Sequence, residues 1–142
     1  MHGIGKTYEE LKLGDKESFT KTITETDIGI YGDLTGDFNP VHFDAEFAKK
    51  SIFGERVAHG PLTLGLIAPV LGMKLPGMGS ILLHIEARFL APVKIGDTIT
   101  AEGELIEKIE KKRSVKLRIK FYNQHGKDVI MGTATLLPPR KE

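Results

Sequence analysis

An apolar run from Leu62 to Leu75 places the strongest limit on how this chain can fold. The helix that this run predicts carries leucine, isoleucine or valine on almost every side, and a helix that is apolar all round must be buried. Pro61 suits its first turn, because the N–H that proline lacks is not needed there. Pro69 should kink the helix or shift its hydrogen bonding locally. The run is too short to span a bilayer.

The segments on either side of this run have the character of strands. Two of them alternate apolar with polar side chains, which is the period of a half-buried strand, and three are rich in β-branched residues or are looser in pattern. The five segments are residues 17–24, 83–89, 99–109, 115–121 and 129–136. One buried helix among about five strands predicts an α+β fold, in which a mostly antiparallel sheet wraps around a long central helix.

The composition is that of an ordinary globular domain, which we expect residues 1–142 to form, with residues 137–142 as a frayed tail. The formal net charge is +1, so no strong field favours nucleic acid or a membrane surface. The chain contains no cysteine, which excludes disulfides, thiolate metal ligands and a cysteine nucleophile. No secretory leader is visible, and we expect a cytoplasmic protein.

Two short helices are predicted before the apolar run. Thr24 followed by Asp27 three residues later is typical of a helix start, and this first helix should end near Gly36. Asp44 can cap a second helix over residues 45–50. The inner face of the second helix would carry Phe47 and Ala48.

The segment between these helices brings a carboxylate, a carboxamide and an imidazole within six residues: Asp37, Asn39 and His42. Pro40 fixes its own φ and biases Asn39 away from the helical region, so we expect a bent, restrained loop. Such a loop can turn Asp37 and His42 toward one water molecule, where they could share general acid and base work. The same residues are also good turn formers, since Asp and Asn bond their own backbone. Spacing alone leaves both interpretations open.

Three stretches of the chain together resemble the MaoC-like dehydratases, most closely the R-specific enoyl-CoA hydratases. The resemblance extends from about residue 13 to residue 137, and its first stretch is long and specific. The stretches are Tyr31 with Leu34-Thr35-Gly36-Asp37, Asn39-Pro40, His42, Asp44 and Phe47-Ala48; Arg56-Val57-Ala58-His59-Gly60; and Phe89-Leu90-Ala91-Pro92-Val93 with Gly96-Asp97.

The resemblance implies a single hotdog domain that pairs with a second copy to form a homodimer or a higher homo-oligomer. It also implies a hydro-lyase that adds water to trans-2-enoyl-CoA and gives (R)-3-hydroxyacyl-CoA, with no cofactor. Asp37 and His42 would be the catalytic pair, and either could protonate carbon 2. Asn39 would hold the loop or orient the water. The backbone N–H of Gly60 would contact the thioester oxygen.

Other candidate residues are less specific. His59 is more plausibly structural than a substrate contact, and Ile52 and Phe53 are expected to line the acyl tunnel together with the apolar helix. No pair of histidines has a helical metal spacing, and we expect no metal. Cations for the coenzyme A phosphates could include Arg56, but solvated surface charge is the better explanation for each candidate taken separately. The other two candidates of this kind are Arg88 and Lys94.

Three alternatives compete with the hydratase hypothesis. A 3-hydroxyacyl-[acyl-carrier-protein] dehydratase would use the same chemistry with a protein carrier, and a basic rim around the tunnel would favour it. A hotdog module could bind acyl thioesters without turnover, although the intact Asp37, Asn39 and His42 argue against this. A thioesterase would release free thiol.

Overall fold

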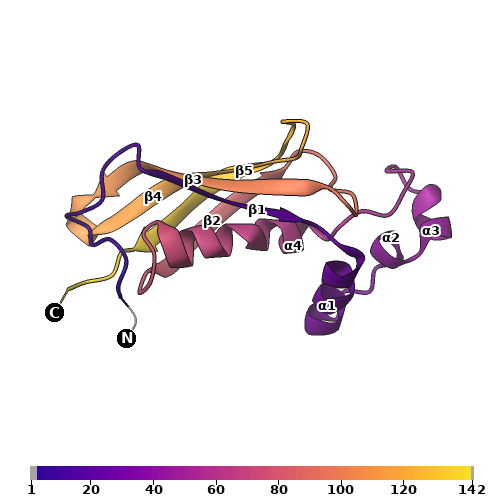
Figure 1. Ribbon diagram of the computed structural model, residues 1–142, viewed down its shortest axis with the longest axis horizontal. Helices are drawn as coiled ribbons and strands as arrows, with labels where there is room; N and C mark the ends of the chain where they lie inside the picture. Colours follow the sequence, from indigo (N-terminus) through magenta and orange to yellow (C-terminus); the bar gives the residue numbers. More distant parts are fainter. Residues whose placement is uncertain (1–2, 142) are drawn as a thin grey trace.

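The computed structural model describes residues 3–141 and contains one five-stranded antiparallel sheet. The strand order is β1-β3-β4-β5-β2, so β1 and β2 form the two edges (Figure 1). The strands are β1 (Lys16–Thr22), β2 (Ile81–Phe89), β3 (Thr98–Ile109), β4 (Ser114–Tyr122) and β5 (Asp128–Leu137). The strand number and the antiparallel pairing confirm the prediction from sequence.

A helical segment lies against one face of the sheet, as Figure 1 shows. It begins with α4 (Gly60–Leu64), continues as a 3₁₀ turn η1 (Gly65–Ile67) and ends as a π-helical turn η2 (Val70–Lys74). The expected long central helix is therefore three short pieces. Proline at position 69 has no N–H for the carbonyl of Gly65, which instead accepts the N–H of Ala68 one residue earlier. The predicted local shift in hydrogen bonding at Pro69 is confirmed.

The core lies between this helical segment and the sheet. The inward side chains of β3 and β4 alternate with polar ones, so that Leu105, Leu117 and Ile119 are buried while their neighbours face solvent. Val70 and Leu71 from the helical segment meet them as members of the same buried cluster. The helical segment is thus held by packing on the sheet rather than by its own hydrogen bonds.

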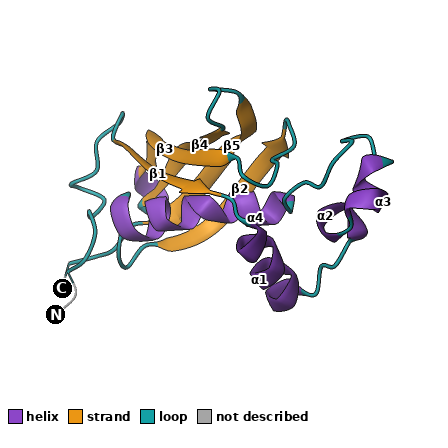
Figure 2. Ribbon diagram, turned by 45° about the vertical axis from the view of Figure 1, so that its right-hand side comes forward, coloured by secondary structure: helices purple, strands orange, loops and turns teal. Residues whose placement is uncertain are grey.

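Three further helices lie beyond one end of the sheet, away from the two chain termini (Figure 2). They are α1 (Glu25–Thr35), α2 (Pro40–Phe43) and α3 (Ala45–Lys49). The side chain of Thr24 accepts the N–H of Asp27 and the Asp27 carboxylate accepts the N–H of Thr24, which confirms the predicted helix start. Slight burial alone would raise the pKa of Asp27, but bonds from Thr24 and the ammonium of Lys21 outweigh it and hold the pKa below its ordinary value.

Glycine in the middle of α1 has a packing reason. A Cβ atom at Gly32 would lie 2.6 Å from Cζ of Phe43, which belongs to α2. The bare backbone at Gly32 therefore lets the Phe43 ring approach α1 closely. This contact joins α1 to the segment that carries the candidate catalytic residues.

Three expectations from sequence are wrong in detail. The alternation over residues 83–89 places Leu83 and Phe89 on the same face as Ile85 and Ala87, which do pack against the core, but Leu83 and Phe89 are 53% and 55% exposed, because β2 is an edge strand whose outer part is not covered in this chain. Phe47 is also exposed, and Ala48 alone is the buried face of α3. The frayed tail expected from residue 137 does not begin there, since Leu137 ends β5 and the next two residues are buried prolines.

No helix within residues 3–141 is long and apolar enough to cross a membrane.

Candidate active site

The turn after α1 is held by its own polar side chains. Gly36 adopts a φ of 81°, which ends α1, and its N–H reaches the carbonyl of Gly32 at 2.7 Å. Asn39 then caps α2, since its Oδ1 accepts the N–H of Val41 at 3.2 Å. The expected loop is therefore partly wrong: one helical turn begins at Pro40, because proline suits the first position of a helix. Asn39 has the loop-holding role that was anticipated.

Asp37 keeps one carboxylate oxygen free for chemistry. Its Oδ1 accepts the N–H of Asn39 at 3.1 Å, which is the turn bond that these residue types predict. Oδ2 has no hydrogen-bond partner within residues 3–141, and the side chain is exposed. Turn formation and catalysis are thus compatible here, because each can use a different oxygen of the same carboxylate.

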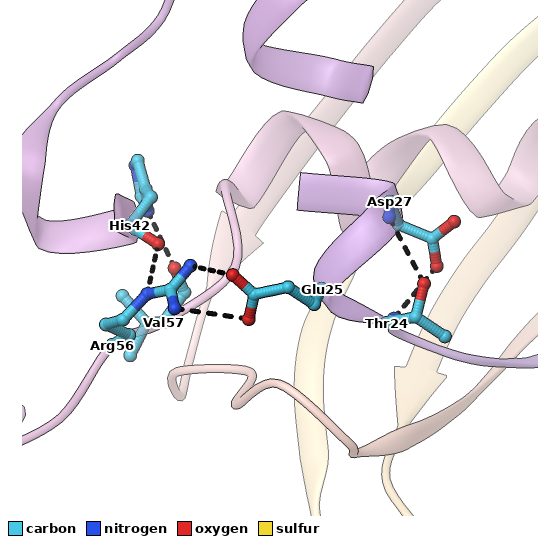
Figure 3. Close-up of polar contacts among 6 residues, drawn as sticks. All are labelled: Thr24, Glu25, Asp27, His42, Arg56 and Val57. Carbon is cyan, nitrogen blue, oxygen red and sulfur yellow. Dashed lines mark hydrogen bonds and ion pairs between the residues drawn. The ribbon is translucent and has the colours of Figure 1, made fainter. Parts of the chain in front are cut away.

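The ring of His42 has a fixed orientation. Its Nδ1 lies 2.7 Å from the carbonyl oxygen of Val57 (Figure 3). A carbonyl can only accept, so we assign the ring proton to Nδ1. In the neutral ring, Nε2 then carries the lone pair. A histidine oriented in this way can take a proton through Nε2 while Nδ1 stays bonded to the backbone.

His59 is a buried support for this pair. Its side chain is completely buried, and its Nε2 lies 3.0 Å from the backbone carbonyl of Asp37. The ring of His59 stacks on the ring of His42, with their centroids 3.9 Å apart. The centroid of the Tyr31 ring lies 4.6 Å from that of His59. Nδ1 of His59 and Oγ1 of Thr63, which follows one helical turn later, are buried without a partner among the described residues. The burial and the bond to the Asp37 backbone support a structural role.

We expect His59→Ala to lower the free energy of unfolding by about 2–4 kcal/mol, because it leaves a cavity and removes the bond to the Asp37 carbonyl. Urea unfolding measures this loss, and steady-state kinetics on the folded fraction measures turnover. Thr63→Val, which removes an unpaired buried hydroxyl on the helix that follows His59, serves as a control and should unfold at nearly the wild-type midpoint. A His59→Ala protein with wild-type stability and no turnover would contradict the structural role.

Asp37, His42 and His59 form one compact cluster. Their potential ligand atoms all lie within 4.8 Å of one another, a spacing that could also hold a metal ion. A search of the sequence for two histidines at helical spacing could not find this group, because His59 is distant from Asp37 and His42 in the sequence and lies beside them only in the folded chain. The prediction that the protein uses no metal therefore needs a direct test.

A cavity of about 360 Å³ opens beside His42. Its wall is mostly apolar and comes from the α2 turn, the start of α4 and the segment after β2. The lining residues are Asn39, Val41, His42, Phe53, Val57, Ala58, Gly60, Thr63, Phe89, Leu90, Ala91, Pro92, Val93 and Ile130. A larger hollow of about 830 Å³ lies near the chain termini around Tyr8 and Arg113. The smaller cavity is lined by His42 and Asn39, and Asp37 lies next to His42 without being part of the wall, so we assign the site to this cavity.

The structure places some of the expected substrate contacts in the cavity wall and others outside it. Phe53 lines the cavity, whereas Ile52 is 95% exposed and is not part of its wall in this chain. From the apolar helix, only Gly60 and Thr63 reach the cavity. A Cβ atom at Gly60 would lie 2.8 Å from the ring of Phe89, so a side chain at this position would displace that ring. Contact of the Gly60 N–H with substrate stays a prediction.

Two of the three proposed phosphate-binding cations are already paired. Lys94 lies 3.3 Å from the carboxylate of Glu55, and Arg56 forms a two-bond contact with Glu25. Sequence reasoning missed this role of Arg56, and it missed Val57, whose backbone carbonyl orients His42. A backbone acceptor carries no signal in residue identity, and the Arg56 contact joins residues 31 positions apart.

Comparison with known proteins agrees with this geometry. The family model described as "MaoC like domain" matches residues 11–124. An (R)-specific enoyl-CoA hydratase from Rhodospirillum rubrum is 40% identical over 134 residues, covering 94% of this chain and 92% of the relative. A 3-hydroxybutyryl-CoA dehydratase from Methylorubrum extorquens is 38% identical, covering 95% and 85%.

Comparison with solved structures supports the same family through the fold. The unliganded R-hydratase PhaJ1 from Pseudomonas aeruginosa superimposes with a TM-score of 0.89 at 39% identity, covering 96% of this chain and 88% of that one. The hotdog fold expected from the resemblance is confirmed. From the extent of the family match and the similarity of the relatives, this chain belongs to the MaoC-like domain family.

Proposed function

We propose that this protein is an (R)-specific enoyl-CoA hydratase, a hydro-lyase that reversibly adds water to trans-2-enoyl-CoA and forms (R)-3-hydroxyacyl-CoA. One observation carries the proposal: the imidazole of His42, with a free Nε2, lines an apolar cavity, and the carboxylate of Asp37, with a free oxygen, lies within 4.8 Å of that imidazole. The names of the similar proteins support the same reaction and the same thioester carrier.

The reaction needs one oxygen transfer and two proton movements. Water gives its oxygen to carbon 3, the electron pair of the double bond moves toward the thioester oxygen, and a proton reaches carbon 2. Asp37 and His42 hold the water, and between them they take up its proton and supply the proton for carbon 2. Because the two groups act from one side of the substrate, water adds in the syn sense. Asn39 supports the turn that carries them.

Developing charge on the thioester oxygen needs a donor. Gly60 is the first residue of α4, where backbone N–H groups have no partner within the helix. Its N–H is our candidate for this contact, since Gly60 also lines the cavity beside His42. The acyl chain would lie along the apolar wall near Phe53. A change of one methylene in such a wall alters chain preference by about 1–3 kcal/mol.

We further propose that the protein works as a homodimer, or a higher homo-oligomer, in the cytoplasm. The edge strand β2 leaves Ile81, Leu82 and Leu83 about half exposed, with unpaired backbone groups beside them. An uncovered apolar edge is a template for pairing with another strand. A second copy of the same strand would extend the sheet and cover these side chains.

Leu83→Lys tests this interface. A charge on the exposed apolar edge should weaken the dimer by at least tenfold in dissociation constant, because each buried lysine would lie at the two-fold contact. Size-exclusion chromatography with light scattering at micromolar protein reports the mass. Lys16→Leu, on the opposite edge strand β1, is the matched control and should leave the mass unchanged. A wild-type protein that elutes as a monomer would contradict the paired form.

The reaction itself is tested with crotonyl-CoA. The enoyl-thioester absorbance should fall while no free thiol appears, and the product should be the R-3-hydroxyacyl thioester by chiral analysis. Release of thiol would identify a thioesterase instead. No change with crotonyl-CoA or a longer enoyl-CoA would favour a carrier-protein dehydratase or a module without turnover. The same assay with EDTA tests for a metal, and we expect no loss of rate.

A further inference from the structure

The guanidinium of Arg56 makes three hydrogen bonds to two partners. Its Nε donates to the backbone carbonyl of His42 at 2.7 Å, and its two terminal nitrogens donate to the two carboxylate oxygens of Glu25 at 3.1 and 2.9 Å (Figure 3). The Arg56 side chain is 20% exposed, so it is largely enclosed by these partners. Arginine is the side chain that can serve both acceptors together, because its donors lie in one rigid plane.

The other end of this contact is also fixed. Glu25 is the first residue of α1, directly after Thr24. The reciprocal bonds between Thr24 and Asp27 set the position of that helix start, as Figure 3 shows beside the Arg56 contact. The carboxylate of Glu25 therefore extends from an ordered backbone, although the side chain itself is 68% exposed.

Two adjacent residues, Arg56 and Val57, form hydrogen bonds with His42. Arg56 binds its backbone carbonyl, and the carbonyl of Val57 accepts from its Nδ1. The N–H of Val57 also reaches the carbonyl of Val41 at 3.3 Å. Residues 56–57 therefore fix the position of both the backbone and the ring of His42. Loss of the backbone bond would allow the α2 turn to shift, and the ring would then no longer be held at a fixed distance from the carbonyl of Val57.

We infer that Arg56, held by Glu25, is a positioning residue for the reaction, which locks the backbone of His42 so that its Nε2 points toward the reacting atoms. This inference rests on the proposed function. The contact is not a strong source of stability, because an ion pair with an exposed carboxylate contributes little to the folded state. Its effect should instead appear in turnover, since a displacement of about 1 Å can cost on the order of 100-fold in rate.

Arg56→Lys tests the inference, because lysine keeps the charge but cannot bond both acceptors in the same plane. We expect kcat to fall about tenfold or more, with KM within about twofold and the urea midpoint nearly unchanged. Glu25→Gln keeps one acceptor oxygen for Arg56, so its kcat should fall less than that of Arg56→Lys. Arg118→Lys is the matched control: Arg118 pairs with Glu104 at 3.5 Å on the sheet, and its change should leave kcat at the wild-type value.

Nitrogen-15 NMR of the His42 ring gives a readout that does not depend on turnover. Wild type should show the Nδ1–H form, and Arg56→Lys should show an altered tautomer ratio or an exchange-broadened signal. A kcat and ring signal at wild-type values in Arg56→Lys would overturn the inference. So would a rise in KM alone, which would make Arg56 a phosphate contact. A wild-type protein inactive on enoyl-CoA refutes the proposed function, while the ring signal still tests the positioning contact.

Discussion

Asp37→Asn should lower kcat by about 10²–10⁴-fold, the usual contribution of a general acid or base. The variant separates chemistry from structure well, because within residues 3–141 the carboxylate accepts a single hydrogen bond, from the N–H of Asn39 to Oδ1. An asparagine in the same place offers an amide oxygen to that N–H, so the turn should survive. The amide cannot take a proton from water, and the free oxygen position of the wild type becomes a weak donor.

The comparison variant is Asp33→Asn. Asp33 is an exposed carboxylate in α1, four residues before Asp37, and unlike Asp37 it is not part of the cluster with His42 and His59. Its neutralisation changes net charge by the same amount, so it should keep kcat within about twofold of wild type. Single-turnover hydration of crotonyl-CoA and urea unfolding should be measured for both. Near-normal turnover in Asp37→Asn would remove Asp37 from the chemistry.

Local signals in the sequence predicted the local structure well. Thr24 with Asp27, and Asp44 at the next helix start, formed the expected caps because each bond joins residues two or three positions apart. Pro69 disrupted the helical hydrogen bonding as its missing N–H requires. Alternation predicted β4 accurately, since that strand is central and one face of it is buried.

The errors arise where burial depends on distant parts of the chain. The same alternation held in the middle of β2, where Ile85 and Ala87 pack against the core, but not at Leu83 and Phe89, which are exposed on this edge strand. The turn of α2 was expected to be a loop, but the bias that a proline places against helix acts on the residue before it and not on the residues after it. Phe89 was expected in the core, yet its ring packs on Gly60 and lines the cavity.

For the site, the sequence supplied the candidate reacting groups, whereas the residues that surround them are visible only in the fold. Asp37, Asn39 and His42 are close together in the chain, so a motif can contain them. The partners that orient them come from elsewhere: the carbonyl of Val57 is 15 residues from His42, and the ring of His59 is 22 residues from the Asp37 carbonyl. A backbone carbonyl has the same chemistry in every residue, so its role is visible only in the fold.

His42→Asn should be at least as damaging as Asp37→Asn, with a fall in kcat of about 10²–10⁴-fold. Asparagine is chosen because its side-chain N–H can take the place of Nδ1 and donate to the carbonyl of Val57, which lies 2.7 Å away in the wild type. The variant then lacks Nε2 while the bond that anchors the side chain persists. A fall in kcat with unchanged unfolding would be attributable to the missing nitrogen.

His42→Gln provides the opposite substitution, because its longer side chain places an amide near the position of Nε2 but is less suited to reach Val57. Neither amide can accept a proton near neutral pH, so both variants should be slow if proton transfer is the role of His42. If His42 only orients water by hydrogen bonding, His42→Gln should retain most of the wild-type kcat and His42→Asn should not. Stopped-flow hydration of crotonyl-CoA distinguishes these results. Full activity in His42→Asn would mean that the bond to Val57, and not Nε2, is what the reaction requires of this residue.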